Sequence, residues 1–400
     1  MKIAFYCDEK FGANFNNFEN IGTSGTVNDL IWAAKGLVEL GHNVTIFNDS
    51  EAGTFGGIKH ILTENVQDLR EHFSTTQDYD FLVINGWAIE NFLDSRLSSV
   101  PTIYWSHNYV DEKIYTNALN NNIINGIICV SIDHLSSFLS KRTAAKICAL
   151  KKASYIYNPV SSRQIAKFAS HGNRVRNNMV FAGALRENKG FHDALRIALK
   201  TISQNSSIKF IVCGSAGLHG TKSSELFENT FYESKIKPLI EEFPDIYKNN
   251  VIFKGKLTRP ELFKEMTSAF ACLQNPSWDS QPETLGMAII ESQILGTPVV
   301  TSHRGGAAES VADGLSGFLI KSKDDSKFIE NLLSLHKQNI STSTKMEKGS
   351  KIISDRFDYP NIAKQWEQHF KQLQSKQNFG WTPITTSINK KLNNFKRRLA

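Results

Sequence analysis

Two glutamates eight residues apart, Glu283 and Glu291, have the type and spacing most informative about chemistry. Glu283 stands just before, and Glu291 within, a helix predicted over residues 288–295. Eight residues of helix rise about 12 Å and end about 80° beyond two full turns, so both carboxylates are expected on one side. Paired carboxyl groups of glycoside hydrolases lie closer, roughly 5–9.5 Å apart. The wider spacing suits the two ends of an elongated ligand, such as a sugar and a ribose joined by a diphosphate.

The residues between the two glutamates offer backbone groups suited to phosphate. Helix N-termini carry unpaired N–H groups and a partial positive charge. Gly286 would let an anion approach with no side chain in the way. An alternative is that Glu283 is only a helix-start acid and Glu291 a solvated residue. The expected amides are those of Thr284, Leu285, Gly286 and Met287.

Short apolar segments alternate with longer amphipathic ones along the chain, which is typical of parallel sheets covered by helices. The predicted fold class is α/β, with two Rossmann-like doubly wound domains facing each other across a cleft. A helix over residues 26–40 is expected to end at Gly41. Strands are predicted at residues 2–7, 43–47, 81–85, 102–105, 127–131, 179–182, 208–213, 251–253, 271–273 and 298–301.

The bulk composition is that of a globular protein of two domains. The chain has 400 residues, of which 40% are hydrophobic and 21% charged. It contains no apolar run of about 18 residues, as a membrane span would need. Its start lacks a signal peptide's features and is expected to be a buried strand. Scattered cysteines predict buried thiols in a reducing cytoplasm; they are Cys7, Cys129, Cys148, Cys213 and Cys272.

Residues 275–320 resemble the nucleotide-sugar site of retaining GT-B glycosyltransferases of the group 1 type (glycosyltransferase family four), which carry an E-x7-E motif. The resemblance implies that Glu283 contacts the donor sugar and Glu291 the ribose of a nucleotide-diphosphate-sugar. The matching pieces are Pro276-Ser277, Glu283-Thr284-Leu285-Gly286, Glu291-Ser292, Gly296-Thr297-Pro298-Val299-Val300, Gly305-Gly306, Glu309, Asp313-Gly314 and Gly317.

A second match follows the strand at 179–182. The family has Gly-Arg-Leu and, a few residues later, Lys-Gly, and its Arg and Lys hold the donor diphosphate. Lys189 matches the lysine, whereas Ala184 stands where the arginine is expected. Arg186, two residues further on, is the candidate substitute for that arginine. The alternative for Lys189 is a solvated helix-start lysine.

Three further positions match the family less specifically. The loop from Gly22 to Gly25 resembles the glycine loop that approaches the donor phosphate, with a plain turn as the alternative. His107 follows a strand, as does the family's histidine near the reacting sugar; an unrelated histidine is the alternative. Gly255 and Lys256 fall where the family's backbone binds the nucleotide base.

No catalytic metal and no cofactor are predicted. Asp78-Tyr79-Asp80 has the Asp-x-Asp spacing of metal-dependent glycosyltransferases, but it precedes the strand at 81–85 and is interpreted as an acidic turn. The diphosphate charge would be balanced by Lys189, Arg186 and the helix-start amides.

The resemblance gives each segment a role. Residues 1–157 would form the acceptor-side domain, 158–178 a linker, 179–357 the nucleotide-sugar domain, and 358–375 a helix crossing back to the first domain. In the tail, 376–400, apolar residues recur at spacings of four, four, three and four among basic ones. Such a helix over 384–400 suits an anionic membrane surface, or else packs on the protein itself. The stripe is Ile384, Ile388, Leu392, Phe395 and Leu399.

The resemblance implies a retaining, metal-independent hexosyltransferase that uses a UDP- or GDP-sugar donor and a saccharide or lipid-linked acceptor. Bacterial surface polysaccharide assembly is the expected setting, in the cytoplasm or on the inner face of the membrane. Rival hypotheses are a nucleotide-sugar epimerase or hydrolase, and a catalytically silent nucleotide-sugar-binding protein. The net charge of +7 suggests nucleic-acid binding as a further rival hypothesis. Neither domain carries an aromatic-and-basic ladder, however, so no nucleic-acid partner is predicted.

Overall fold

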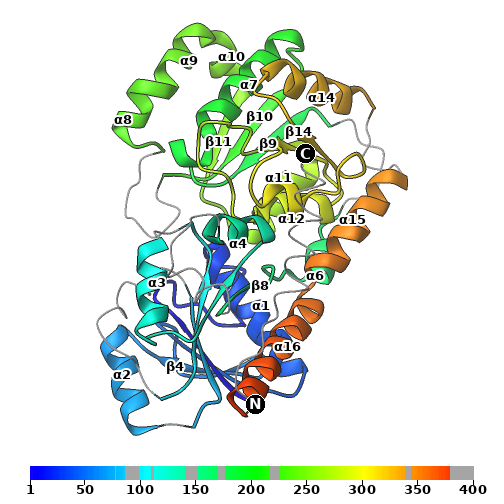
Figure 1. Cartoon of the computed structure of the whole chain (residues 1–400). Coiled ribbons are helices and arrows are strands. Elements are labelled where there is room, and N and C mark those ends of the chain that lie inside the picture. The colour runs from blue at the N-terminus through cyan, green and yellow to red at the C-terminus, as the bar shows by residue number, and fades with distance from the viewer. Residues whose placement is uncertain are drawn as a thin grey trace. The chain divides into compact units, whose positions relative to one another are not determined.

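The computed structural model describes residues 1–76, 78–85, 99–109, 112–139, 152–169, 176–216, 226–338 and 344–378 (Figure 1). The chain divides into two compact units. Unit 1 holds Met1–Phe18, Gly25–Pro159 and the chain from Tyr359 onward. Unit 2 holds Val160–Asp358 together with the short segment Glu19–Ser24, which comes from the N-terminal part of the sequence. Each unit is built on its own sheet.

The sheet of unit 1 has the strand order β3-β4-β2-β1-β5-β6-β7-β8 among the described residues. Neighbouring strands are parallel except β3 and β4, which form an antiparallel hairpin at one edge. The strands are β1 (Lys2–Cys7), β2 (Asn43–Asn48), β3 (Gly53–Phe55), β4 (Ile58–Leu62), β5 (Phe81–Asn85), β6 (Thr102–Ser106), β7 (Gly126–Cys129) and β8 (Ala153–Tyr155). The helices are α1 (Gly25–Glu39), α2 (Val66–Thr75), α3 (Glu112–Asn120), α4 (Ile132–Leu139) and α16 (Tyr359–Asn378).

Helix α16 joins unit 1 from the far end of the sequence by packing on α1. A Cβ added at Gly36 of α1 would lie 2.6 Å from the Cβ of Ala363, so only glycine allows this approach. Trp32 stacks on Tyr359 with ring centroids 5.0 Å apart. Trp366 is fully buried. Burying side chains of this size contributes roughly 1.5–3 kcal/mol each, so α16 is an integral part of this unit's core.

The sheet of unit 2 has the order β11-β10-β9-β12-β13-β14, all parallel. This is the doubly wound order, in which the topological switch point lies between β9 and β12. The strands are β9 (Asn178–Ala182), β10 (Lys209–Cys213), β11 (Val251–Gly255), β12 (Ala269–Gln274), β13 (Val299–Ser302) and β14 (Gly317–Ile320). The helices are α6 (Ser162–Ala166), α7 (Phe191–Gln204), α8 (Asn229–Phe231), α9 (Lys237–Glu242), α10 (Pro244–Asn250), α11 (Arg259–Ser268), α12 (Met287–Ile294), α13 (Ala307–Ser310), α14 (Asp325–Gln338) and α15 (Thr344–Phe357).

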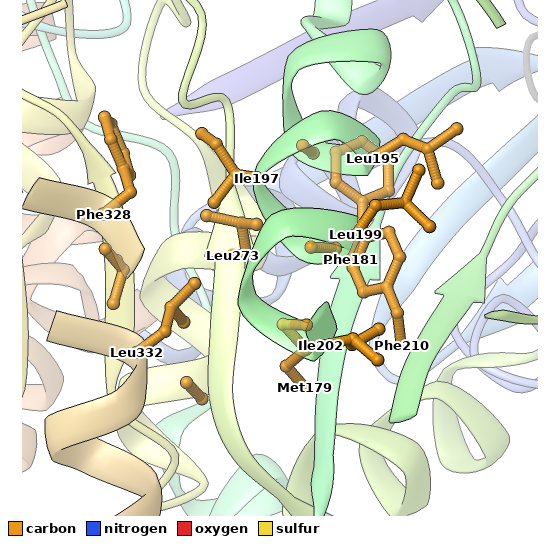
Figure 2. Packing of buried hydrophobic residues seen from close by; sticks show 14 of the residues in the cluster. Met179, Phe181, Leu195, Ile197, Leu199, Ile202, Phe210, Leu273, Phe328 and Leu332 are labelled. Atoms are coloured by element: carbon orange, nitrogen blue, oxygen red, sulfur yellow. The ribbon is translucent and has the colours of Figure 1, made fainter. Parts of the chain in front are cut away.

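One hydrophobic cluster joins the strands of unit 2 to helices that pack on them (Figure 2). Helix α7 places apolar residues at helical spacing, so one of its faces is continuous with the strand side chains. Helix α14 packs beside α7 and adds Phe328 and Leu332 to the same cluster. This core is close-packed, so the strands β9 and β12 are held rigidly. The loops that follow their carboxyl ends therefore start from fixed positions. The cluster includes Met179, Phe181, Leu195, Ile197, Leu199, Ile202, Phe210 and Leu273.

The predicted α/β fold with two Rossmann-like domains is confirmed. All ten predicted strands are present, with ends within two residues of the expected ones. The sequence did not reveal β3, β4, β8 and β14, which have three to five residues and are too short for a clear pattern. No helix among the described residues has the length and apolarity needed to cross a membrane. The predicted membrane-contacting helix at 384–400 and Cys148 lie outside the described residues.

Candidate nucleotide-sugar site

Lys189 and Glu283 meet at the switch point of unit 2. Lys189 belongs to a short 3-10 turn, Glu187–Lys189, between β9 and α7. Glu283 lies in the segment between β12 and α12. The Lys189 Nζ atom is 3.0 Å from both carboxylate oxygens of Glu283. The two side chains are 36% and 19% exposed, so a ligand can reach both. A cation and a carboxylate thus lie side by side where doubly wound folds bind ligands.

The backbone around Glu283 is held in place by contacts with Gly306. The backbone N–H of Gly306 donates to the carbonyl oxygen of Glu283 at 2.7 Å. A Cβ added at Gly306 would lie only 2.0 Å from the carbonyl oxygen of Thr284, so no larger residue fits. The Ser310 hydroxyl of α13 also donates to the carbonyl oxygen of Leu285. The Gly305-Gly306 motif therefore acts on the position of Glu283 through backbone packing.

Glu283 precedes the helix that carries Glu291, as predicted. Gly286 has a left-handed backbone, with φ of +88°, and α12 begins only at Met287. Glu283 therefore precedes the helix, and the separation of about 12 Å expected from helical rise does not apply. Residues 284–287 remain at the helix start, and the first N–H groups of α12 have no partner inside the helix.

Glu291 lies on α12 and is almost completely buried, with 3% of its surface exposed. Its Oε1 atom accepts a hydrogen bond from Arg259 Nη2 at 2.6 Å. Arg259 is the first residue of α11 and follows the loop after β11. Arg259 was not among the residues predicted from the sequence. Its one available signal was its place just after Gly255 and Lys256, at the carboxyl end of a predicted strand.

The predicted glycine loop and the predicted base site are neighbours within unit 2. Gly255 ends β11 with φ of +70°, and a Cβ there would meet open space. Gly22 has φ of +62°, and a Cβ there would lie 3.3 Å from Lys256 Cε and 3.4 Å from the Leu257 carbonyl oxygen. Gly25, in contrast, is the first residue of α1 and belongs to unit 1.

Arg186 is bonded to residues other than the lysine–glutamate pair. Its Nε atom donates to the carbonyl oxygen of Ala216 at 3.0 Å and lies 3.5 Å from a carboxylate oxygen of Glu228. Ala184, in the place of the family's arginine, is buried. These contacts argue against the idea that Arg186 replaces the missing arginine. The role of Lys189 as the cation for the diphosphate stays a prediction.

His107 is buried in unit 1 just after β6. Its Nδ1 atom lies 3.4 Å from Asn158 Nδ2 and 3.7 Å from Asp29 Oδ2, the latter beyond hydrogen-bond length. Burial, with a smaller contribution from His134, lowers the pKa of His107 to about 3. The imidazole is therefore neutral at physiological pH.

Replacing His107 with Gln should flatten the acid side of the stability profile. Because folding lowers the pKa of His107, its neutral form stabilises the native state above the unfolded pKa of about 6.5, and this contribution is lost as pH falls towards 3. A single proton gives a slope of up to about 1.4 kcal/mol per pH unit. Urea unfolding between pH 6 and pH 4 should show a shallower loss of unfolding free energy in the variant. If the unfolding free energy of the wild type and of the variant fell equally with pH, the lowered pKa of His107 would be contradicted.

The Asp-x-Asp pair is occupied by contacts at the start of the first strand. The backbone N–H of Lys2 donates to Asp80 Oδ2 at 2.7 Å, and Lys2 Nζ donates to Asp78 Oδ2 at 3.0 Å. In the described part of the chain, no group of three or more His, Cys, Asp or Glu side chains is arranged to hold a metal ion. The interpretation of Asp78-Tyr79-Asp80 as an acidic turn is consistent with these bonds.

Two doubly wound domains, one with polar side chains gathered at its switch point, define the GT-B fold. Among solved structures, Anabaena Alr3699/HepE in complex with UDP-glucose matches with a TM-score of 0.67 and 19% identity, over 93% of this chain and 100% of that one. Such low identity supports the fold alone. Residues 163–352, which make up most of unit 2, match the model of the family described as glycosyl transferases group 1. This part of the chain is therefore similar to that family.

Two curated relatives illustrate the family. D-inositol 3-phosphate glycosyltransferase from Corynebacterium urealyticum is 25% identical over 198 residues, which is 48% of this chain and 42% of that protein. Lipopolysaccharide 1,2-N-acetylglucosaminetransferase from Salmonella typhimurium is 19% identical over 315 residues, 77% of each chain. The chain spans only 32–43% of the length of four of the curated relatives that it matches.

Proposed function

We propose that this chain is a retaining, metal-independent glycosyltransferase that moves a hexosyl group from a UDP- or GDP-sugar to a hydroxyl of a saccharide or lipid-linked acceptor. The observation that supports it most is the contact of Lys189 with Glu283 at the switch point. The HepE complex with UDP-glucose supports a nucleotide-sugar donor, and the Salmonella relative's name supports surface polysaccharide assembly. His107 and Gly25, in unit 1, remain predictions from the family resemblance.

The proposed mechanism uses the two paired side chains for different tasks. The Lys189 ammonium and the amides at the start of α12 bind the donor diphosphate. Glu283 accepts hydrogen bonds from sugar hydroxyls and fixes the ring. As the bond from the anomeric carbon to the diphosphate breaks, positive charge develops on that carbon. The acceptor hydroxyl attacks from the same face and gives its proton to the departing phosphate oxygen. No protein nucleophile is needed, and fixed charges supply the catalysis.

Ala184 favours one alternative function, a nucleotide-sugar-binding protein without transferase activity. The family's second phosphate cation is missing at this buried position, and Arg186 is bonded elsewhere. A binding protein would be stabilised by nucleotide sugars but would release no nucleotide when acceptors are supplied. An epimerase or hydrolase would instead consume the donor with no acceptor present.

A screen of nucleotide sugars tests the proposal. We expect at least one UDP- or GDP-sugar to raise the melting temperature of the wild type, and the same donor to release its nucleotide only with a matching saccharide acceptor. Lys189→Met, which keeps the stem without the charge, should weaken donor binding about tenfold or more because a charge-assisted bond to phosphate is lost. The matched variant Arg186→Met should bind within about threefold of the wild type. Equal losses in both variants, or no stabilising nucleotide sugar, would contradict this site.

A further inference from the structure

A second acid–base pair in unit 2, Arg259 with Glu291, is much more deeply buried than the first. The two side chains are 13% and 4% exposed, and the bond from Nη2 to Oε1 is 2.6 Å long. Exposed ion pairs contribute little to stability, whereas removing one partner of a buried pair leaves an uncompensated charge. Within the described part of the chain, Oε1 of Glu291 has this donor and Oε2 has no hydrogen-bond donor.

Arg259 is itself fixed by its surroundings. Its guanidinium carbon lies 5.0 Å from the centroid of the Phe263 ring. A capping box holds the start of α11, where the side chain of Glu261 accepts hydrogen bonds from the backbone and hydroxyl of Thr258. The backbone N–H of Arg259 also donates to the carbonyl oxygen of Glu19 at 3.3 Å. A side chain anchored in this way sets the direction in which its partner carboxylate faces.

The pair of Arg259 and Glu291 lies next to segments that are predicted to bind the nucleotide. Arg259 follows the loop of Gly255 and Lys256 at the carboxyl end of β11, and Glu291 lies on the helix that begins beside Glu283. The segment Glu19–Ser24, which includes Gly22, packs on the same loop. The Nη2 atom of Arg259 donates to a carboxylate that is itself almost completely buried. The role that this contact favours for Arg259 is orientation of Glu291.

We propose that Arg259 is a positioning residue for ribose recognition: it holds Oε1 of Glu291 so that Oε2 accepts a hydrogen bond from a ribose hydroxyl of the donor nucleotide. This inference rests on the proposed function, because it takes Glu291 as the ribose contact. Without the guanidinium, the carboxylate loses its fixed orientation and with it the ability to select for the hydroxyl. The base and the diphosphate are bound by other groups, so their contribution to affinity remains.

Paired nucleotides that differ only in the ribose test this role. Calorimetric titrations with uridine diphosphate and with 2′,3′-dideoxyuridine diphosphate, and with the guanosine pair alongside, would be run on the wild type, Arg259→Met and Arg259→Lys. The wild type should prefer the ribonucleotide about tenfold or more, the scale of one charge-assisted hydrogen bond. In Arg259→Met that preference should fall to within about twofold, while affinity for the dideoxynucleotide stays within about twofold of the wild type. Arg259→Lys should recover part of the preference.

The matched control is Arg196→Met, which removes another arginine–carboxylate pair from unit 2. Arg196 donates to Asp325 through Nε at 2.9 Å and Nη2 at 3.0 Å, on α7 and α14. This variant should keep the full ribose preference. An unchanged preference in Arg259→Met, or an equal loss of affinity for both nucleotides, would overturn the positioning role alone. A wild type that binds both nucleotides equally would instead overturn the ribose role of Glu291, and a wild type that binds neither would overturn the proposed function.

Discussion

Replacing Glu283 with Gln should lower kcat by about two orders of magnitude, while affinity for the free nucleoside diphosphate stays within about threefold of the wild type. The carboxylate is proposed to hold the sugar hydroxyls and to face the positive charge that develops at the anomeric carbon. Losing one preorganised electrostatic group at a reacting centre typically costs about 10²–10³ in kcat. The amide is nearly isosteric, so packing is preserved. Initial rates with a saturating donor, together with calorimetry of the free nucleotide, would separate the two effects.

The structure offers a control for this variant on the same loop. Asp279 lies four residues before Glu283 in an ion pair with Lys323, and both side chains are mostly exposed, at 80% and 65%. Asp279→Asn removes a nearby carboxylate whose interaction is screened by water, so kcat should stay within about twofold. If Glu283→Gln instead weakened nucleotide binding and left kcat intact, Glu283 would be a phosphate-site or structural residue, and the sugar contact would have to lie elsewhere.

The fold was predictable from the sequence because fully buried parallel strands are nearly continuous apolar runs. The run at β5 (Phe81–Asn85) is buried along its whole length and follows the acidic segment Asp78-Tyr79-Asp80. Strand β14 (Gly317–Ile320) has four residues and begins with a glycine, so nothing separates it from a turn. Short edge strands such as β3 and β14 form because the sheet beside them already exists. That information is tertiary, and no window of sequence contains it.

The candidate site was predictable where a residue follows a strand at the switch point. Lys189 and Glu283 are 94 residues apart, yet the doubly wound order places the ends of β9 and β12 next to each other. The partner of Glu291 could not be predicted in this way. Arg259 is the first residue of α11, shortly after the edge strand β11, and its side chain bonds to a residue of α12. The predicted separation of the two glutamates assumed helical rise from Glu283 onward, whereas the helix begins only at Met287, after the left-handed backbone at Gly286.

Replacing Gly306 with Ala should lower the rate of transfer by about 10²-fold, although this residue contacts no substrate in the proposed mechanism. Its backbone angles, φ of −64° and ψ of −15°, are ones that alanine adopts freely, so the effect is steric. The new Cβ would lie 2.0 Å from the Thr284 carbonyl oxygen and 2.7 Å from Leu285 Cα. These are backbone atoms that no rotamer change can move. The segment carrying Glu283 must therefore shift by about an ångström, and a displacement of that size costs about 10²-fold in rate.

A substitution at a second glycine of unit 2 tests whether activity is lost through displacement of Glu283 or through lower stability. A Cβ at Gly317 would lie 2.6 Å from Val311 Cγ1 and 3.1 Å from the Val299 carbonyl oxygen. Gly317 begins β14, at the amino ends of the strands and so opposite the candidate site. Overpacking should cost each variant about 1–3 kcal/mol of unfolding free energy. At 10 °C, with folding verified by circular dichroism, Gly317→Ala should transfer the sugar at close to the wild-type rate, while Gly306→Ala should be slower by about 10²-fold. If the two variants lost activity only in proportion to their stability, the support of Glu283 by Gly306 would have no catalytic role.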